Sequence, residues 1–234
     1  MNYIYQTIHT IAHHPLYVAE HCRLLEQAFM ELYFRPLRLD AESVEEAVAE
    51  LLTSERVTRE LSVFVELRVD IEFRWSVVVS DVSIYSGYSL RCVRPTAECV
   101  TFDSPFGRYP TSARREVLRF AGDLALNFGA ELAIECDTKG CVISAAGAAL
   151  FGVVDRCLVT TPLLQSVERE LVMTAAKAHR LEIVEEQYTK KELAKFEELF
   201  AADHLGITSI SRCGDRHYMS IVAERIAIKM AAPF

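Results

Sequence analysis

The feature that most constrains the fold of this 234-residue chain is how the spacing of its apolar residues changes along the sequence. Residues 17–34 carry apolar side chains at every third or fourth position, which is typical of a helix. Residues 61–102 instead hold runs rich in Val, Ile, Phe and Tyr at 63–69, 75–79 and 90–93, which predict an antiparallel meander. This mixture lacks strict strand–helix–strand alternation, so we predict the α+β class rather than a doubly wound sheet.

The remaining elements are predicted from the same two spacings and from capping residues. Ser166 is a candidate N-cap, and Thr189-x-x-Glu192 is a capping box that predicts a helix ending near Phe200. Helices are expected at residues 41–52, 112–127, 167–179 and 218–230, and strands at 3–11, 132–136, 141–144, 150–154, 157–160, 181–185 and 207–210.

Residues 103–110 are the strongest candidate for a linker, because they place two prolines and a glycine between a predicted strand and a predicted helix. We therefore expect a smaller N-terminal α+β lobe over residues 1–104 and a C-terminal α+β lobe over residues 105–234. A cleft between the lobes is expected near residues 106–111.

Charge and hydropathy exclude several classes of protein. The formal net charge is −8 and the sequence has no cluster of Lys and Arg, so nucleic acid is not an expected partner. The longest charge-free apolar stretch, residues 141–154, falls short of the roughly 20 residues that a membrane span requires, so no membrane contact is expected. The N-terminus shows no basic segment followed by an apolar one, and we expect a cytoplasmic protein.

The seven cysteines include no Cys-x-x-Cys pair, which argues against a disulfide framework and a zinc knuckle and favours small buried side chains. The densest group of possible metal ligands consists of Asp203, His204, Cys213, Asp215 and His217. Its spacings match no closed coordination shell, so a polar loop is the favoured interpretation and no metal ligand is assigned.

Several segments, in their order and spacing, resemble the class IV (fold-type IV) pyridoxal-phosphate enzymes. These enzymes include branched-chain aminotransferases, D-amino-acid aminotransferases and 4-amino-4-deoxychorismate lyases. The segments are Tyr5-Gln-Thr-Ile8, Glu20-His-Cys-Arg-Leu24, Asp137-x-x-Gly140, residues 158–162 and Gln165-Ser-Val-Glu-Arg169. The resemblance implies a two-lobed α+β fold like that of D-amino-acid aminotransferase, pyridoxal phosphate as cofactor, and a homodimer.

The resemblance also assigns cofactor-binding positions. Arg23 stands where the family's arginine holds the cofactor phosphate, and the backbone amides of Ser166 and Val167 stand where a helix start binds the same group. His204 corresponds to a late phosphate-binding threonine. Ser144 corresponds to the glutamate that pairs with the pyridine nitrogen.

Two departures affect the chemistry. The family's Schiff-base lysine belongs at the start of the helix after the linker, but residues 108–114 contain no lysine, and neither does any position before Lys139. A serine also replaces the pairing glutamate. No catalytic residue is therefore assigned, and pyridoxal phosphate is expected to bind weakly or not at all. Two interpretations stay open: a divergent class IV aminotransferase or aminodeoxychorismate lyase-like protein, and a non-catalytic binding or structural protein with a remodelled cleft for a small anion.

Overall fold

The computed structural model describes residues 2–85, 87–103 and 107–231. Its contacts divide the chain into unit 1, residues 1–87 and 109–113, and unit 2, residues 88–108 and 114–234. The boundary expected between residues 104 and 105 differs from this division, because strand β5 (Thr96–Thr101) pairs with strand β6 (Leu132–Cys136) of unit 2. Residues 104–106, which include the start of the expected cleft, lie outside the described residues.

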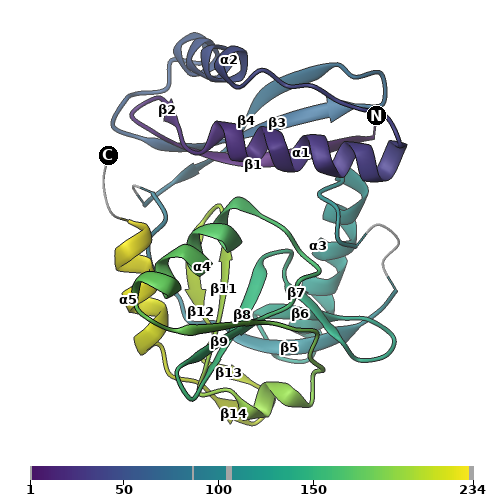
Figure 1. Cartoon of the computed structure of the whole chain (residues 1–234), viewed down its shortest axis with the longest axis vertical. Helices are drawn as coiled ribbons and strands as arrows, with labels where there is room; N and C mark the ends of the chain where they lie inside the picture. Colours follow the sequence, from purple (N-terminus) through teal and green to yellow (C-terminus); the bar gives the residue numbers. More distant parts are fainter. Residues whose placement is uncertain (1, 86, 104–106, 232–234) are drawn as a thin grey trace. The chain divides into compact units, whose positions relative to one another are not determined.

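Unit 1 is an antiparallel sheet packed against two helices, with α1 running across the sheet in Figure 1. The strand order is β2 (His14–Pro15), β1 (Tyr3–Ile11), β3 (Ser62–Asp70) and β4 (Trp75–Ser83), and the helices are α1 (Val18–Tyr33) and α2 (Ala41–Ser54). Cys22, Leu25 and Phe29 follow helical spacing and are buried against Ile4 and Ile8 of β1. The expected strand at 3–11 and both expected helices are confirmed.

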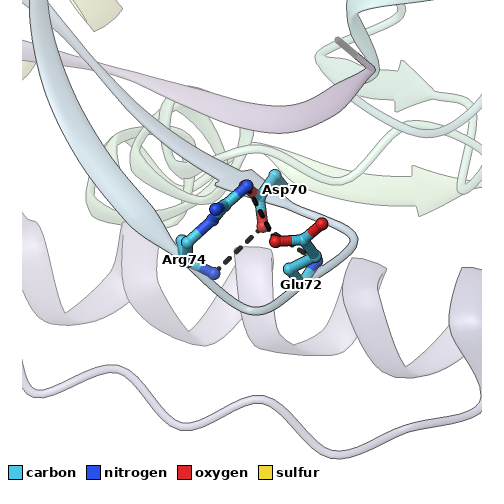
Figure 2. Close-up of polar contacts among 3 residues, drawn as sticks. All are labelled: Asp70, Glu72 and Arg74. Atoms are coloured by element: carbon cyan, nitrogen blue, oxygen red, sulfur yellow. Dashed lines mark hydrogen bonds and ion pairs between the residues drawn. The ribbon is translucent and has the colours of Figure 1, made fainter.

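The turn between β3 and β4 is held by one carboxylate (Figure 2). Asp70 Oδ1 accepts the backbone N–H groups of Glu72 and Arg74 at 2.8 and 3.1 Å. Asp70 Oδ2 accepts Arg74 Nε at 2.9 Å, and Arg74 Nη2 also lies 2.9 Å from Glu72 Oε2. Burial alone would raise the pKa of Asp70, but the hydrogen bonds and the Arg74 charge outweigh it and lower that pKa. The ionised carboxylate therefore organises the turn.

Among the described residues, unit 2 contains two five-stranded sheets, three α-helices and one short 3₁₀ helix. One sheet has the order β14 (Arg216–His217), β13 (Arg212–Cys213), β5, β6 and β7 (Val142–Ala145). The other has the order β10 (Glu182–Glu185), β9 (Cys157–Thr160), β8 (Ala149–Val154), β11 (Glu198–Asp203) and β12 (Gly206–Ser209). Helix α3 (Ser112–Asn127) connects the parallel pair β5–β6, and α4 (Val167–Ala178) connects the parallel pair β9–β10. Both are crossover connections of the kind that parallel strands require.

Three expectations from the sequence are wrong. The strand at residues 90–93 is reduced to one bridge between Leu90 and Ile207, and β5, which lies within the range of the expected antiparallel meander, pairs in parallel with β6. The capping box forms, since Thr189 N–H donates to Glu192 Oε2 at 2.9 Å, but the helix is a single 3₁₀ turn, η1 (Glu192–Lys195). Strand β11 follows it, because pairing with β8 and β12 buries residues 198–202 inside a sheet.

The last helix, α5 (Ile221–Met230), starts three residues later than expected and lies beside α4 in Figure 1. Within the described part of the chain, no helix is both long enough and apolar enough to cross a membrane.

Candidate functional site

A buried ion pair joins α3 to strands β6 and β7 within unit 2. Arg114 lies seven residues before Ala121 and eleven before Ala125, so it falls on the face of α3 that packs against the sheet. Its side chain is 6 % exposed, and that of its partner Glu135 is 2 % exposed. Two opposite charges are thus enclosed where apolar residues are the rule.

Ser144 lies between the two charges. Arg114 Nη2 donates to Ser144 Oγ at 3.1 Å, and Ser144 Oγ donates to Glu135 Oε1 at 2.6 Å. The backbone N–H of Gly147 donates to the same carboxylate oxygen at 2.8 Å, and Arg114 Nη2 lies 3.7 Å from Glu135 Oε2. The three side chains form a closed network in which a guanidinium and hydrogen bonds compensate the buried carboxylate.

A second buried carboxylate, Glu168, lies in the first turn of α4. The preceding Ser166 is the N-cap, as expected, and its hydroxyl accepts the N–H of Arg169 at 3.1 Å. Burial raises the pKa of Glu168 to about 7, and the charge of Asp203 adds to the rise, against the lowering effect of the nearby backbone and of the Ser166 and Tyr88 hydroxyl groups. Burial therefore favours the neutral form of the Glu168 carboxyl.

The five residues assigned from the sequence fall into four places. Ser166 and Val167 begin α4, and His204 lies in the β11–β12 turn, directly after the Asp203 that acts on Glu168. Ser144 is fully buried in the Arg114 network. Arg23 is exposed on α1 and belongs to unit 1. Its convergence with Ser166 and Val167 stays a prediction.

Arg114, Glu135 and Glu168 are not among the site residues expected from the sequence. For Glu168 and Arg114, the spacing of buried residues along the helix indicates that the charged side chain faces the core. Glu168 precedes the buried Val172 and Ala175 by four and seven residues, as Arg114 precedes the buried residues of α3. A charged residue on the core-facing stripe of an amphipathic helix indicates a buried polar partner.

The candidate metal ligands do not share one place. Asp203 and His204 lie in the hairpin of β11 and β12, whereas Cys213 and His217 lie in the hairpin of β13 and β14 in the other sheet. Among the residues that the structure describes, no three His, Cys, Asp or Glu side chains are arranged to hold a metal ion.

All seven cysteines are free thiols, but only Cys22 and Cys136 are fully buried, and Cys92 is exposed. The Sγ atoms of Cys99 and Cys213 lie 3.9 Å apart. Hydrogen bonding with Cys136 and burial raise the pKa of Cys99 to about 12, against the lowering effect of Cys213. Cys99 therefore has little thiolate near neutral pH, and thiolate is the nucleophilic form.

Comparisons with known proteins agree on the architecture. The family model described as amino-transferase class IV matches residues 4–213. A fold IV transaminase from Curtobacterium pusillum superposes with a TM-score of 0.81 at 18 % identity, covering 98 % of this chain and 84 % of that one. A putative 4-amino-4-deoxychorismate lyase from Legionella pneumophila gives 0.80 at 14 % identity, covering 97 % and 89 %. An aminotransferase from Brucella abortus, solved with bound pyridoxal phosphate, gives 0.79 at 13 % identity, covering 97 % and 87 %. No curated protein sequence matches the chain.

Proposed function

The chain belongs to the class IV aminotransferase family, and we propose that it is a divergent member without the family's pyridoxal-phosphate chemistry. In this proposal the fold-type IV scaffold is a binding protein. The observation that carries the proposal is the distribution of cations in unit 2: every lysine is exposed, and the buried cation of the network around Ser144 is an arginine.

Covalent attachment of pyridoxal phosphate requires a lysine amine held at the cofactor aldehyde. The six lysines all lie at exposed positions: Lys139 in the turn after β6, Lys177 in α4, Lys190, Lys191 and Lys195 around η1, and Lys229 in α5. Arg114 is buried but cannot replace an amine, because a guanidinium stays protonated and is not a nucleophile near neutral pH.

The cofactor ring also needs an acid that keeps its pyridine nitrogen protonated. The resemblance puts Ser144 at that place, and a serine hydroxyl carries no negative charge for the purpose. The neighbouring Glu135 is already engaged by Ser144, Gly147 and Arg114. Neither side chain suits this role.

The start of α4 is a poor phosphate site. A free helix N-terminus attracts anions, but here the carboxyl of Glu168 lies in the first turn and is buried. Above its pKa of about 7 this group is an anion itself and would repel a phosphate. The residues present therefore do not fit pyridoxal phosphate.

The other interpretation is a functional pyridoxal-phosphate enzyme, which the Brucella abortus structure favours as a structural relative. One experiment distinguishes the binding-protein interpretation from the enzyme interpretation. The purified protein is titrated with pyridoxal phosphate while its visible absorbance is recorded. It is then reduced with borohydride, and the adducts are mapped by mass spectrometry. We expect no defined absorbance band and only substoichiometric adducts spread over several exposed lysines. One stoichiometric adduct on a single lysine, with transaminase or lyase activity, would restore the enzyme interpretation.

A further inference from the structure

Unit 2 has a surface hollow of about 420 Å³ that none of the residues discussed above lines. It lies among the β8–β9 turn, the residues that follow α4, and helix α5, which is yellow in Figure 1. Val153, Leu181 and Ile226 contribute apolar surface. Arg156 and Arg225 contribute two guanidinium groups. The hollow thus combines an apolar surface with positive charge in a protein whose net charge is −8.

The two guanidinium groups keep their charge available to a ligand. Among the described residues, neither Arg156 nor Arg225 takes part in the ion pairs that arginines form. Glu197 is the acidic residue among those that line the hollow, so two positive charges face one negative charge. The excess favours an anion.

A contact between α4 and α5 involves the backbone of Arg225. Nε2 of His179, the C-cap residue of α4, lies 3.2 Å from the backbone carbonyl oxygen of Arg225. This contact joins the end of α4 to α5 and holds the backbone that carries the second guanidinium.

Arg156 occupies an unusual backbone position. Val154 pairs with Cys157, so Asp155 and Arg156 form a two-residue hairpin turn, with φ of +48° and +63°. Such a turn favours glycine at its second position, because a side chain in the left-handed region is strained. A glycine substitution at Arg156 therefore removes the guanidinium while relieving strain.

We propose that this hollow binds a small organic anion, with the anionic group between Arg156 and Arg225 and an apolar body against Val153, Leu181 and Ile226. Arginine pairs well with planar and tetrahedral oxyanions because its donors form a fixed fork. The hollow has the volume of a small-molecule site. The proposal involves only residues of unit 2 and does not depend on whether the protein binds pyridoxal phosphate.

The test uses the intact chain and phenyl phosphate as the probe, with amide chemical shifts followed during titration. We expect the shifts to change around residues 153–156, 179–181 and 222–226. Inorganic phosphate and phenol, which each supply one half of the probe, should bind at least about tenfold more weakly. Saturable binding elsewhere on the protein, or equal binding of inorganic phosphate, would overturn the proposal.

Arg156→Gly and Arg180→Gly form a matched pair of variants. Arg180 is exposed, has φ of +57° and does not line the hollow, so both variants lose one positive charge and one strained side chain. We expect Arg156→Gly to weaken phenyl phosphate binding by about tenfold or more without lowering Tm, and Arg180→Gly to change it by less than about twofold. Equal effects of the two variants would contradict the proposal.

Glu197→Gln tests the sign of the local charge. Removing the opposing carboxylate should strengthen phenyl phosphate binding by several-fold. Weaker binding in this variant would show that the hollow does not select an anion.

Discussion

The raised pKa of Glu168 gives this single residue an effect on stability. Its pKa is about 7 in the folded protein, against 4.5 for an ordinary glutamate, so between these values the folded state holds a proton that the unfolded state lacks. The stability contributed by the protonated group is complete below pH 4.5 and is lost as pH rises to about 7. The loss amounts to roughly 3 kcal/mol.

Glu168→Gln should remove this dependence, because a neutral amide of similar shape titrates nowhere in the range. We expect the free energy of unfolding of the variant, measured by urea denaturation, to rise relative to that of the parent from pH 5 to about pH 7, and the difference to stay level above that pH. Glu182→Gln, at an exposed position of β10, controls for the loss of one formal charge. Parallel pH profiles for Glu168→Gln and the parent would contradict the prediction.

Arg114 contributes to stability because its guanidinium compensates the buried charge of the Glu135 carboxylate. Arg114→Met leaves the Glu135 carboxylate buried without its cation, and removing one partner of a buried pair costs about 3–5 kcal/mol. Adding Glu135→Gln should recover part of the loss, because the uncompensated charge disappears. Arg119→Met, at an exposed position of the same helix, should change stability by less than about 1 kcal/mol. Chemical denaturation of the four proteins measures these differences, and a fully stable Arg114→Met would refute the role of the pair.

At the scale of elements, replacing glycine by alanine should have opposite effects on stability at two positions. Gly122 lies inside α3 and no atom would meet an added Cβ, so Gly122→Ala should raise stability by about 0.5–1 kcal/mol. Gly152 lies in β8 under the ring of Phe196, which an added Cβ would overlap. Gly152→Ala should therefore lower stability by about 1–3 kcal/mol. Thermal unfolding of both variants checks the pair, and a shift of the same sign in both would contradict the packing argument.

Helix α5 shows how one element is positioned by another. Ser220, its N-cap, makes no side-chain capping bond. The Glu198 carboxylate of β11 instead accepts the N–H groups of Val222 and Ala223 at 2.9 and 3.2 Å. A negative group at a helix N-terminus is favourable. The start of α5 therefore depends on a strand 22 residues earlier in the chain, counted from Glu198 to Ser220.

At the scale of the whole molecule, the family resemblance leads us to expect a homodimer. Several large apolar side chains are exposed, among them Phe34, Phe120, Phe128 and Ile228, and a second copy of the chain can bury such surface. Sedimentation at micromolar concentration should give a species of about twice the 26.4 kDa chain mass. A single species at the monomer mass would contradict this expectation.

Local spacing along the sequence determines much of the fold by itself. Helix α1 and strand β1 are predicted within one residue at each end, because amphipathic periodicity and proline positions act over a few neighbouring residues. The order of motifs is also enough to indicate the family. It is not enough to locate the site, because burial of Arg114 and Glu168 depends on strands that the chain supplies elsewhere.

Tertiary structure determines the conformation of β11, the pairing of β5 and the pKa of Glu168, which local sequence patterns do not predict. Residues 198–203 follow a capping box that predicts a helix, yet they form β11 because β8 and β12 supply hydrogen-bond partners on both sides. Strand β5 joins unit 2 because β6 pairs with it in parallel. The pKa of Glu168 is raised because the packed fold removes water and places Asp203 nearby. Each outcome depends on residues that are distant in sequence, and only the assembled fold brings such residues together.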